Sequence, residues 1–218
     1  MRIPLRICVL AGVIAVLTSC SGNAPTIDEL QWRILLRDDG RQRYEELAIH
    51  VRLSDADADD DPVLLSLSAG RTGLIWRFPR EDWRMDTLEG TDWIGLPSAI
   101  PLEGSRLPQT LYTLRVEDLA GRSDEITFRP DPDRLDPEGI SWPSARLESG
   151  RLVLEGGDGP ATVILRDIDG TPVATVSAID GTAIGDESAA TWELWIDRPE
   201  RSQGFRLGPY PLSGLPGE

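Results

Sequence analysis

The densest group of reactive side chains in this sequence is the acidic run at positions 55–61, DADADDD. Calcium binds several carboxylate oxygens on a flexible loop, which makes Asp55, Asp57 and Asp59 candidate calcium ligands. The run departs from the EF-hand pattern, because aspartate stands at the sixth position, which requires glycine, and serine at the twelfth, which requires glutamate. We interpret it as a solvated acidic turn and keep a looser calcium loop between two strands as the alternative.

His50 is the only histidine in the sequence. Large apolar residues alternate along Glu46–Leu53 and place His50 on the opposite, solvent-facing side of a strand, where a Ser-His-Asp triad would not orient it. The sequence contains no G-x-S-x-G, P-loop or H-E-x-x-H motif. The sequence does not exclude a pair of catalytic carboxylates of the kind used in glycoside hydrolysis, because the distance between two such groups is a property of the fold. We therefore predict a protein that is not an enzyme and needs no cofactor.

Four tryptophans are candidate contact residues for a ligand or a partner protein. Trp83 and Trp93 lie among charged and turn residues, where exposed rings would stack on a sugar or anchor a protein. The alternative is that both rings close the end of a hydrophobic core, because tryptophans are usually highly buried. Trp192 and Trp195 are three residues apart, so a regular strand cannot bury both, and one of them should be exposed or held at a bulge.

Cys20 directly follows Leu17-Thr18-Ser19, at the end of an apolar run that begins at Ile7. Two arginines precede the run, which gives the layout of a secretory signal peptide. The run is too short to span a bilayer, which takes about 20 apolar residues. The tetrapeptide resembles the lipobox of bacterial lipoproteins; the alternative is an ordinary secreted protein with a chance cysteine after its apolar run.

The lipobox resemblance implies a membrane anchor. In that family a diacylglycerol is attached to the cysteine sulfur, the signal peptide is cleaved before the cysteine, and the new amino group is acylated, so that palmitate-type chains on Cys20 would hold the protein to the membrane. In that family, an aspartate directly after the lipidated cysteine favours retention in the inner membrane. This sequence has Ser21 at that position, and the absence of aspartate favours the outer membrane of the bacterial cell envelope. Cys8 lies in the segment to be removed, so the mature chain can form no internal disulfide.

The sequence is strongly acidic. It carries 22 basic side chains, all of them arginine, and 37 acidic ones, for a formal net charge of -15. Removing residues 1–19 takes away two arginines and no acid, which gives -15 - 2 = -17 for the mature chain. Such an excess argues against binding nucleic acid, or anionic lipid through the protein surface.

Alternation of apolar and polar residues is the dominant pattern and predicts strands. It is clearest at 46–53, and two hairpins follow, one joining 63–68 to 74–78 and one joining 111–117 to 124–128. Further short strands are expected at 151–155, 161–168, 171–178, 191–197 and 204–207, with Asp169-Gly170 as a hairpin signal between the second and the third. No amphipathic helix of three turns is evident, so the mature chain is expected to be all-β.

The segment Tyr112–Arg122, YTLRVEDLAGR, resembles the closing hairpin of bacterial immunoglobulin-like repeats, in which a Tyr-x-x-x-Val strand runs into Asp-x-Ala-Gly. Trp76, on an earlier strand, and Tyr112 are similar to the tryptophan and the tyrosine corner of the wider immunoglobulin fold. The resemblance covers roughly residues 30–130. It implies a sandwich without the usual disulfide, because Leu114 stands at the position of the second cysteine.

We therefore predict an all-β protein made of two tandem immunoglobulin-like antiparallel β-sandwich domains after a cleaved signal peptide. Residues 1–19 are the signal peptide, 20–29 a lipidated tether, 30–130 the first sandwich, 131–143 a Pro/Asp-rich linker and 144–218 a second, small β-sandwich. The predicted function is a membrane-anchored envelope lipoprotein that acts as a non-catalytic binding or structural module, through contacts with another envelope protein. Two alternatives stay open: a glycan-binding module that uses exposed tryptophans, and a calcium-stiffened spacer.

Overall fold

The computed structural model describes residues 23–55, 62–88, 90–131, 133–157, 159–186 and 188–212. Its regular structure consists of β-strands and three short 3-10 helices, at Gly70–Thr72, Arg80–Asp82 and Pro199–Arg201, which confirms the all-β class. Within those ranges no helix has the length and apolar character that crossing a membrane takes. The predicted signal peptide, Cys20, Asp57 and Asp59 lie outside the described residues.

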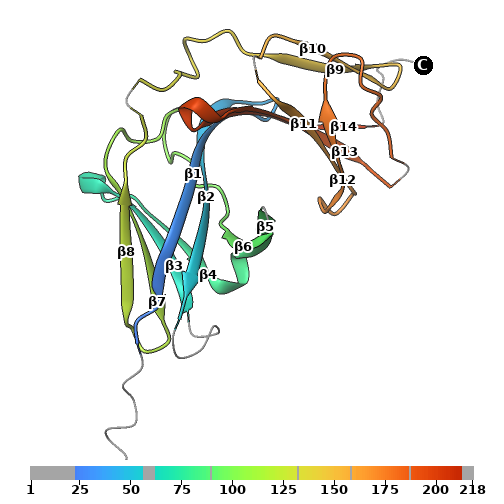
Figure 1. The fold of residues 1–218 in the computed structure, drawn as a ribbon. Helices are drawn as coiled ribbons and strands as arrows, with labels where there is room; N and C mark the ends of the chain where they lie inside the picture. Colours follow the sequence, from blue (N-terminus) through green and yellow to red (C-terminus); the bar gives the residue numbers. More distant parts are fainter. Residues whose placement is uncertain are drawn as a thin grey trace, which may run out of the picture.

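Eight strands form one curved sheet in the order β12-β11-β13-β14-β1-β2-β6-β5 (Figure 1). Neighbouring strands are antiparallel except β1 and β14, which are parallel. The strands are β1 Thr26–Asp38, β2 Arg43–Ser54, β5 Arg84–Leu88, β6 Thr91–Gly95, β11 Ala161–Arg166, β12 Pro172–Ala178, β13 Thr191–Arg198 and β14 Gln203–Pro211. Both predicted halves of the chain thus contribute strands to the same sheet.

A second sheet of four strands, in the order β4-β3-β7-β8, packs on one part of the long sheet. Its strands are β3 Pro62–Ala69, β4 Ile75–Pro79, β7 Tyr112–Asp118 and β8 Ser123–Phe128, so both predicted hairpins are confirmed. The core between the two sheets contains alternate residues of β2 and β7, as the period-2 pattern requires. These residues are Leu47, Ile49, Val51, Tyr112, Leu114 and Val116.

A second hydrophobic core lies at the other end of the long sheet. Here the hairpin of β9 Ser144–Glu148 and β10 Arg151–Glu155 covers strands β11, β13 and β14. Ile34 belongs to the first core and Leu36 to the second. Because these two residues are two positions apart on β1, both cores lie on the same face of the sheet. The opposite face of the sheet is concave, and Figure 1 shows its hollow between the β5–β6 end and the β12 end.

The described residues of the predicted linker, 131–143, are packed against the strands. Arg134 is only 5% exposed. Its Nε and Nη2 donate to the carboxylate of Glu45 on β2, at 2.8 and 3.0 Å, and Nη2 also donates to the carbonyl oxygen of Leu107 at 2.7 Å. The Trp142 ring packs edge-on against Phe205 on β14, with 5.7 Å between the ring centroids. The segment therefore contacts both predicted halves.

The structure also adds to the predicted strands. β1 begins at Thr26, inside the segment expected to be a tether, and β14 continues to Pro211 rather than ending at 207. Strands β5, β6 and β9 were not expected. β5 and β6 pair with each other, and β6 also pairs with β2, so tertiary pairing stabilises strands that lack a clear alternating pattern.

Candidate functional site

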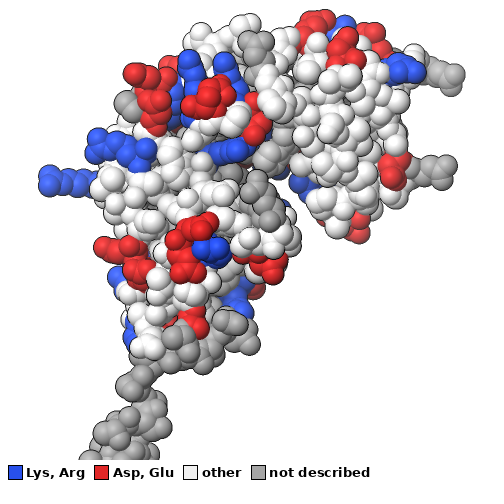
Figure 2. All heavy atoms as spheres, viewed as in Figure 1, with Lys and Arg blue, Asp and Glu red and all other residues white. Residues whose placement is uncertain are grey.

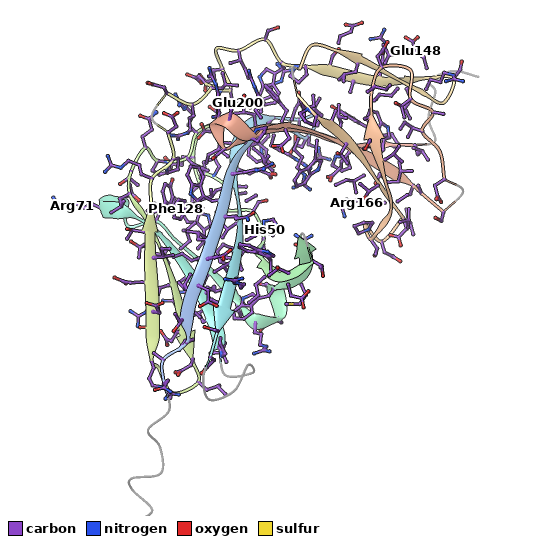
Figure 3. All side chains as sticks on the ribbon, viewed as in Figure 1. His50, Arg71, Phe128, Glu148, Arg166 and Glu200 are labelled. Carbon is purple, nitrogen blue, oxygen red and sulfur yellow. The ribbon has the colours of Figure 1, made fainter. Side chains whose placement is uncertain are left out.

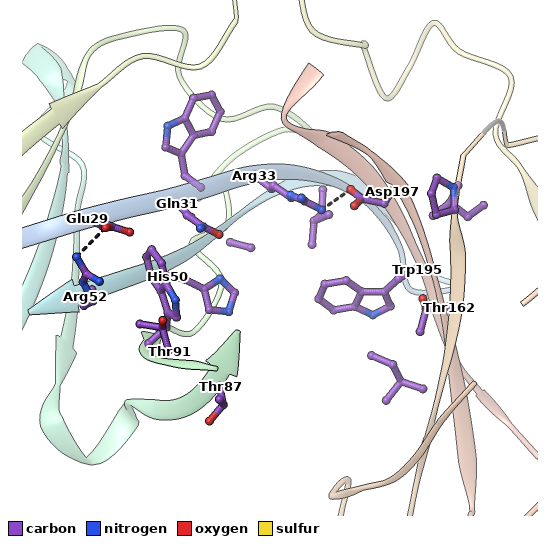
Figure 4. A pocket seen from close by; sticks show the side chains of 17 residues that line it. Glu29, Gln31, Arg33, His50, Arg52, Thr87, Thr91, Thr162, Trp195 and Asp197 are labelled. Atoms are coloured by element: carbon purple, nitrogen blue, oxygen red, sulfur yellow. Dashed lines mark hydrogen bonds and ion pairs between the residues drawn. The ribbon is translucent and has the colours of Figure 1, made fainter. Parts of the chain in front are cut away.

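A groove of about 800 Å³ runs along the concave face of the long sheet (Figure 4). Figure 2 shows the corresponding hollow between the two lobes of the molecule. Residues 29–93 form one side and residues 160–197 the other, so the groove depends on both predicted halves. Its polar lining includes Glu29, Gln31, Arg33, His50, Arg52, Thr87, Thr91, Thr162 and Asp197, and its apolar lining includes Leu35, Ile164 and Trp195.

Strand alternation puts these side chains into the groove. On the core face of β1 and β2, Ile34 lies opposite Leu47, whereas the next pair along, Arg33 and Ala48, points to the groove. Gln31 opposite His50 repeats the same orientation two residues further on. The polar positions that alternate with the core of β1 and β2 therefore form the groove floor.

The charges in the groove lining are balanced and paired. Two acids, Glu29 and Asp197, lie with two bases, Arg33 and Arg52, for a formal sum of zero in a chain of net charge -15. Arg52 donates to Glu29 at 2.6 Å, and Arg33 donates to Asp197, which links β1 to β13 across the groove (Figure 4). Such half-exposed pairs contribute little to stability. They do fix the direction in which the two guanidinium groups point.

His50 lies on the groove wall beside β5. Its Nε2 is 3.2 Å from Oδ2 of Asp86, and its side chain is 34% exposed. Figure 3 shows His50 and Arg166 on opposite sides of the concavity. The predicted solvent-facing position of His50 is thus found on the concave face, where its ring is partly accessible.

A buried ionic network lies beside the groove on the same face of the sheet. The carboxylate of Glu193 accepts hydrogen bonds from Arg37 (3.3 Å), Arg166 (3.3 Å) and Arg206 (3.0 Å). Arg206 also donates to Glu46 at 3.0 Å. Burial alone would raise the pKa of Glu193, but the nearby charges of Arg206 and Arg37, followed by Arg166, outweigh it and hold this pKa below its ordinary value of 4.5.

The network supports Trp195, one of the tryptophans that line the groove. The guanidinium carbon of Arg206 lies 5.1 Å from the centroid of the Trp195 ring, in cation-π geometry. Trp195 is partly exposed, whereas Trp192, three residues earlier, is 2% exposed and packs in the second core. The structure therefore places Trp192 in the core and leaves Trp195 half-buried in the groove lining.

Of the other two candidate tryptophans, one is buried and one is partly buried. Trp93 is 4% exposed, because it lies in strand β6 rather than near a loop, although it closes the end of the groove. Trp83 packs against the first core, and its Nε1 donates to the carbonyl oxygen of Phe78 at 2.9 Å. Trp83 and Trp93 therefore do not form the exposed stacking platform considered for a glycan.

No cluster of three or more residues able to hold a metal ion occurs among the residues that the structure describes. Of the three candidate calcium ligands, only Asp55 lies within those residues. The calcium loop stays a prediction.

The groove residues that the sequence analysis did not single out include Arg33, Arg52, Thr162 and Asp197. Alternation marks the first two as polar positions on strands, but only the shared sheet brings them near Thr162 and Asp197. No protein-family model matches the chain, and no curated protein or solved structure is significantly similar to it.

Proposed function

We propose that this protein is a lipid-anchored lipoprotein of the bacterial cell envelope that binds another envelope protein and catalyses no reaction. Acyl chains on Cys20 hold it at a membrane, and Ser21 favours the outer membrane. The observation that carries the binding role is the groove of about 800 Å³ on the concave face of the long sheet.

The groove suits a protein partner because its polar groups are held in fixed positions. Arg52 is oriented by Glu29 and Arg33 by Asp197. Fixed charges of both signs select a partner with the complementary arrangement and reject others. Little side-chain entropy is then lost on binding, which favours affinity.

We further infer that residues 26–128 form an immunoglobulin-like sandwich. The strand orders β1-β2-β6-β5 and β4-β3-β7-β8 match the orders ABED and C′CFG of that fold. Tyr112 opens β7, the equivalent of strand F, and its hydroxyl donates to the carbonyl oxygen of Pro108 at 2.8 Å, as in a tyrosine corner. Strands β11 to β14 extend the first sheet and do not form a second sandwich of this kind. The immunoglobulin-like inference therefore covers the chain only to about residue 128.

The anchor and the partner are tested together in cells that make the protein. Wild type and Cys20→Ala are grown with a palmitate analogue, fractionated, and crosslinked before mass spectrometry. We expect label and membrane association for wild type alone, and one dominant protein attached to it. An unlabelled wild type free in the periplasm contradicts the anchor, and crosslinks to abundant neighbours only contradict the partner.

The second candidate function is glycan binding in the same groove. It is favoured by the partly exposed ring of Trp195 beside a lining with no net charge. Aromatic rings stack on sugars, and neutral lining suits an uncharged, hydroxyl-rich ligand. Tryptophan fluorescence should then change on adding cell-wall or surface glycans to wild type but not to Trp195→Ala. No change across a broad panel of glycans contradicts this candidate.

A further inference from the structure

The open edges of the sheets differ in how well they are protected against pairing with another chain. The long sheet ends in β12 and β5, and the second sheet ends in β4 and β8. An edge strand presents unpaired backbone N–H and C=O groups, and proteins usually block it with charged side chains, proline, bulges or a covering segment. Three of the four edges have such protection: β5 carries Arg84 and Asp86, β4 carries Arg77 and Pro79, and β8 carries Asp124 and Glu125.

The β8 edge has a second protection, because Asp124 accepts a hydrogen bond from the backbone N–H of Ile27 and the start of β1 covers part of that edge. The two strands of the separate hairpin are protected as well. In the separate hairpin, β9 carries Arg146 and Glu148, and β10 pairs with the segment around Ala183. Strand β12 is therefore the exception among the described edges.

β12 has only weak protection: a register shift interrupts its ladder with β11 near Pro172, at the start of the strand, and the ladder is regular from Ala174 to Ala178. Its sequence, PVATVSA, contains no charged residue, and its one proline is the first residue of the strand, where it interrupts the ladder least. Val173, Thr175 and Val176 are β-branched and favour extended backbone. Apart from its ladder with β11, the strand makes no backbone hydrogen bond to another described residue. None of the described residues thus pairs with the open side of β12.

Exposed apolar side chains lie at both ends of this strand. Ile168, in the turn before β12, is 87% exposed, and Ile179, directly after it, is 74% exposed. Val173 on the strand itself is 37% exposed. Figure 1 shows β12 at the far end of the curved sheet, and Figure 2 shows the visible surface at this end as mainly uncharged, with charged side chains at its margins. Such exposed apolar groups commonly mark an interaction surface.

Charge indicates what kind of strand would pair there. Asp167 and Asp169 precede β12, and Asp180 follows it. Antiparallel pairing of two copies would bring the Asp167 end of one chain against the Asp180 end of the other, between two chains that each carry a net charge of -15. Like charges placed opposite each other disfavour this arrangement. A second copy is therefore a poor occupant, and a strand with basic ends is a good one.

We propose that β12 accepts an additional strand from a partner protein, in a segment that is uncharged and β-branched in its middle and carries Lys or Arg at both ends. Backbone hydrogen bonds supply the affinity, and the basic ends and alternate side chains supply the selectivity. This inference rests on the proposed function as an envelope-protein binder and names one of its contact surfaces, on the strand next to the β11 side of the groove.

The test uses the full-length protein, purified in detergent, and a synthetic peptide of alternating threonine and valine with a Lys-Arg pair at each end. We expect the peptide to bind and to slow amide hydrogen exchange at residues 173–178 by about tenfold or more. A peptide with a Glu-Asp pair at each end should bind roughly tenfold more weakly. The basic peptide carrying N-methyl groups on alternate amides should not bind, because it cannot complete the ladder.

A matched pair of variants locates the site on the protein. Thr175→Lys places a positive charge on exposed β12 and should abolish binding, whereas Thr127→Lys makes the same change on β8 and should not. Failure of the basic peptide to bind overturns the proposal, as does exchange protection in the groove strands instead of β12. Self-association that Thr175→Lys abolishes also overturns it, in favour of a second copy. Membrane anchoring and in-cell crosslinks from the groove are measured in separate experiments. The proposed function can therefore be supported by those experiments even if the peptide does not bind β12.

Discussion

Tyr112 contributes to the first core through its ring and to the chain entry into β7 through its hydroxyl. The ring stacks on Phe128, with 5.6 Å between centroids, and the hydroxyl donates to the carbonyl oxygen of Pro108. Burial raises the pKa of Tyr112 to about 12, so the phenol stays protonated and remains a donor at any physiological pH.

Tyr112→Phe keeps the ring and removes this hydrogen bond. We expect it to lower the free energy of unfolding by about 1 kcal/mol, the usual net value of one buried hydrogen bond. Urea unfolding followed by circular dichroism measures the change. Tyr44→Phe is the matched control, because the Tyr44 hydroxyl makes no hydrogen bond to a described residue. Equal losses in the two variants contradict a specific role for the Tyr112 hydroxyl.

Glu193 makes stability depend on pH. Its pKa is lower in the folded protein than its ordinary value of 4.5, because three arginines surround it. The stabilisation from its ionised form is therefore complete above about pH 4.5 and is lost as the pH falls through the lower, folded-state pKa. Unfolding free energy measured from pH 7 to 3 should fall less steeply for Glu193→Gln than for wild type.

The same variant should also be less stable at pH 7, since it leaves buried arginines without their shared carboxylate. Glu200→Gln, which removes a carboxylate with a side chain 63% exposed, controls for the loss of one charge. Identical pH profiles for Glu193→Gln and wild type contradict this assignment.

Between elements, the ion pair of Arg134 and Glu45 fixes the 131–143 segment to β2. Their side chains are 1% and 0% exposed. Arg134→Met leaves a buried carboxylate whose remaining contacts are the Leu107 N–H and the more distant Arg106, so we expect a loss of about 3 kcal/mol in urea unfolding.

The double variant Arg134→Met with Glu45→Leu removes the unpaired charge and should recover at least about 1 kcal/mol of that loss. Arg146→Met, at an arginine whose side chain is 50% exposed, should cost less than about 0.5 kcal/mol. Simple addition of the two single losses at Arg134 and Glu45 contradicts the assigned coupling.

Strands were predictable where alternation runs long enough. β2, β3, β7, β11 and β12 follow from it, and so does the burial of Leu47, Ile49 and Val51. The parallel pairing of β1 with β14 was not predictable, because it joins Ile34 to Gln203 through a long-range contact with no local sequence signal. The groove was not predictable for the same reason. Trp195 was a candidate residue, but its position opposite His50 depends on the pairing of β1 with β14.

At the scale of the whole molecule, the shared sheet should make the two predicted halves unfold together. β1 contributes to both cores and pairs with β2 on one side and β14 on the other. Tryptophan fluorescence and far-UV circular dichroism in urea should therefore give one coincident transition. Two separate transitions would show that the halves behave as independent domains.

The central claim is that the groove is where an envelope protein binds, and site-specific photo-crosslinking in living cells tests it most directly. A photoreactive amino acid is placed at Thr162 or Thr87, which line the groove, or at Thr127, which is exposed on β8 of the other sheet. We expect both groove positions to crosslink to the same envelope protein and the Thr127 position to give no such product. Absence of product from the groove positions, or equal yield from Thr127, would contradict the claim.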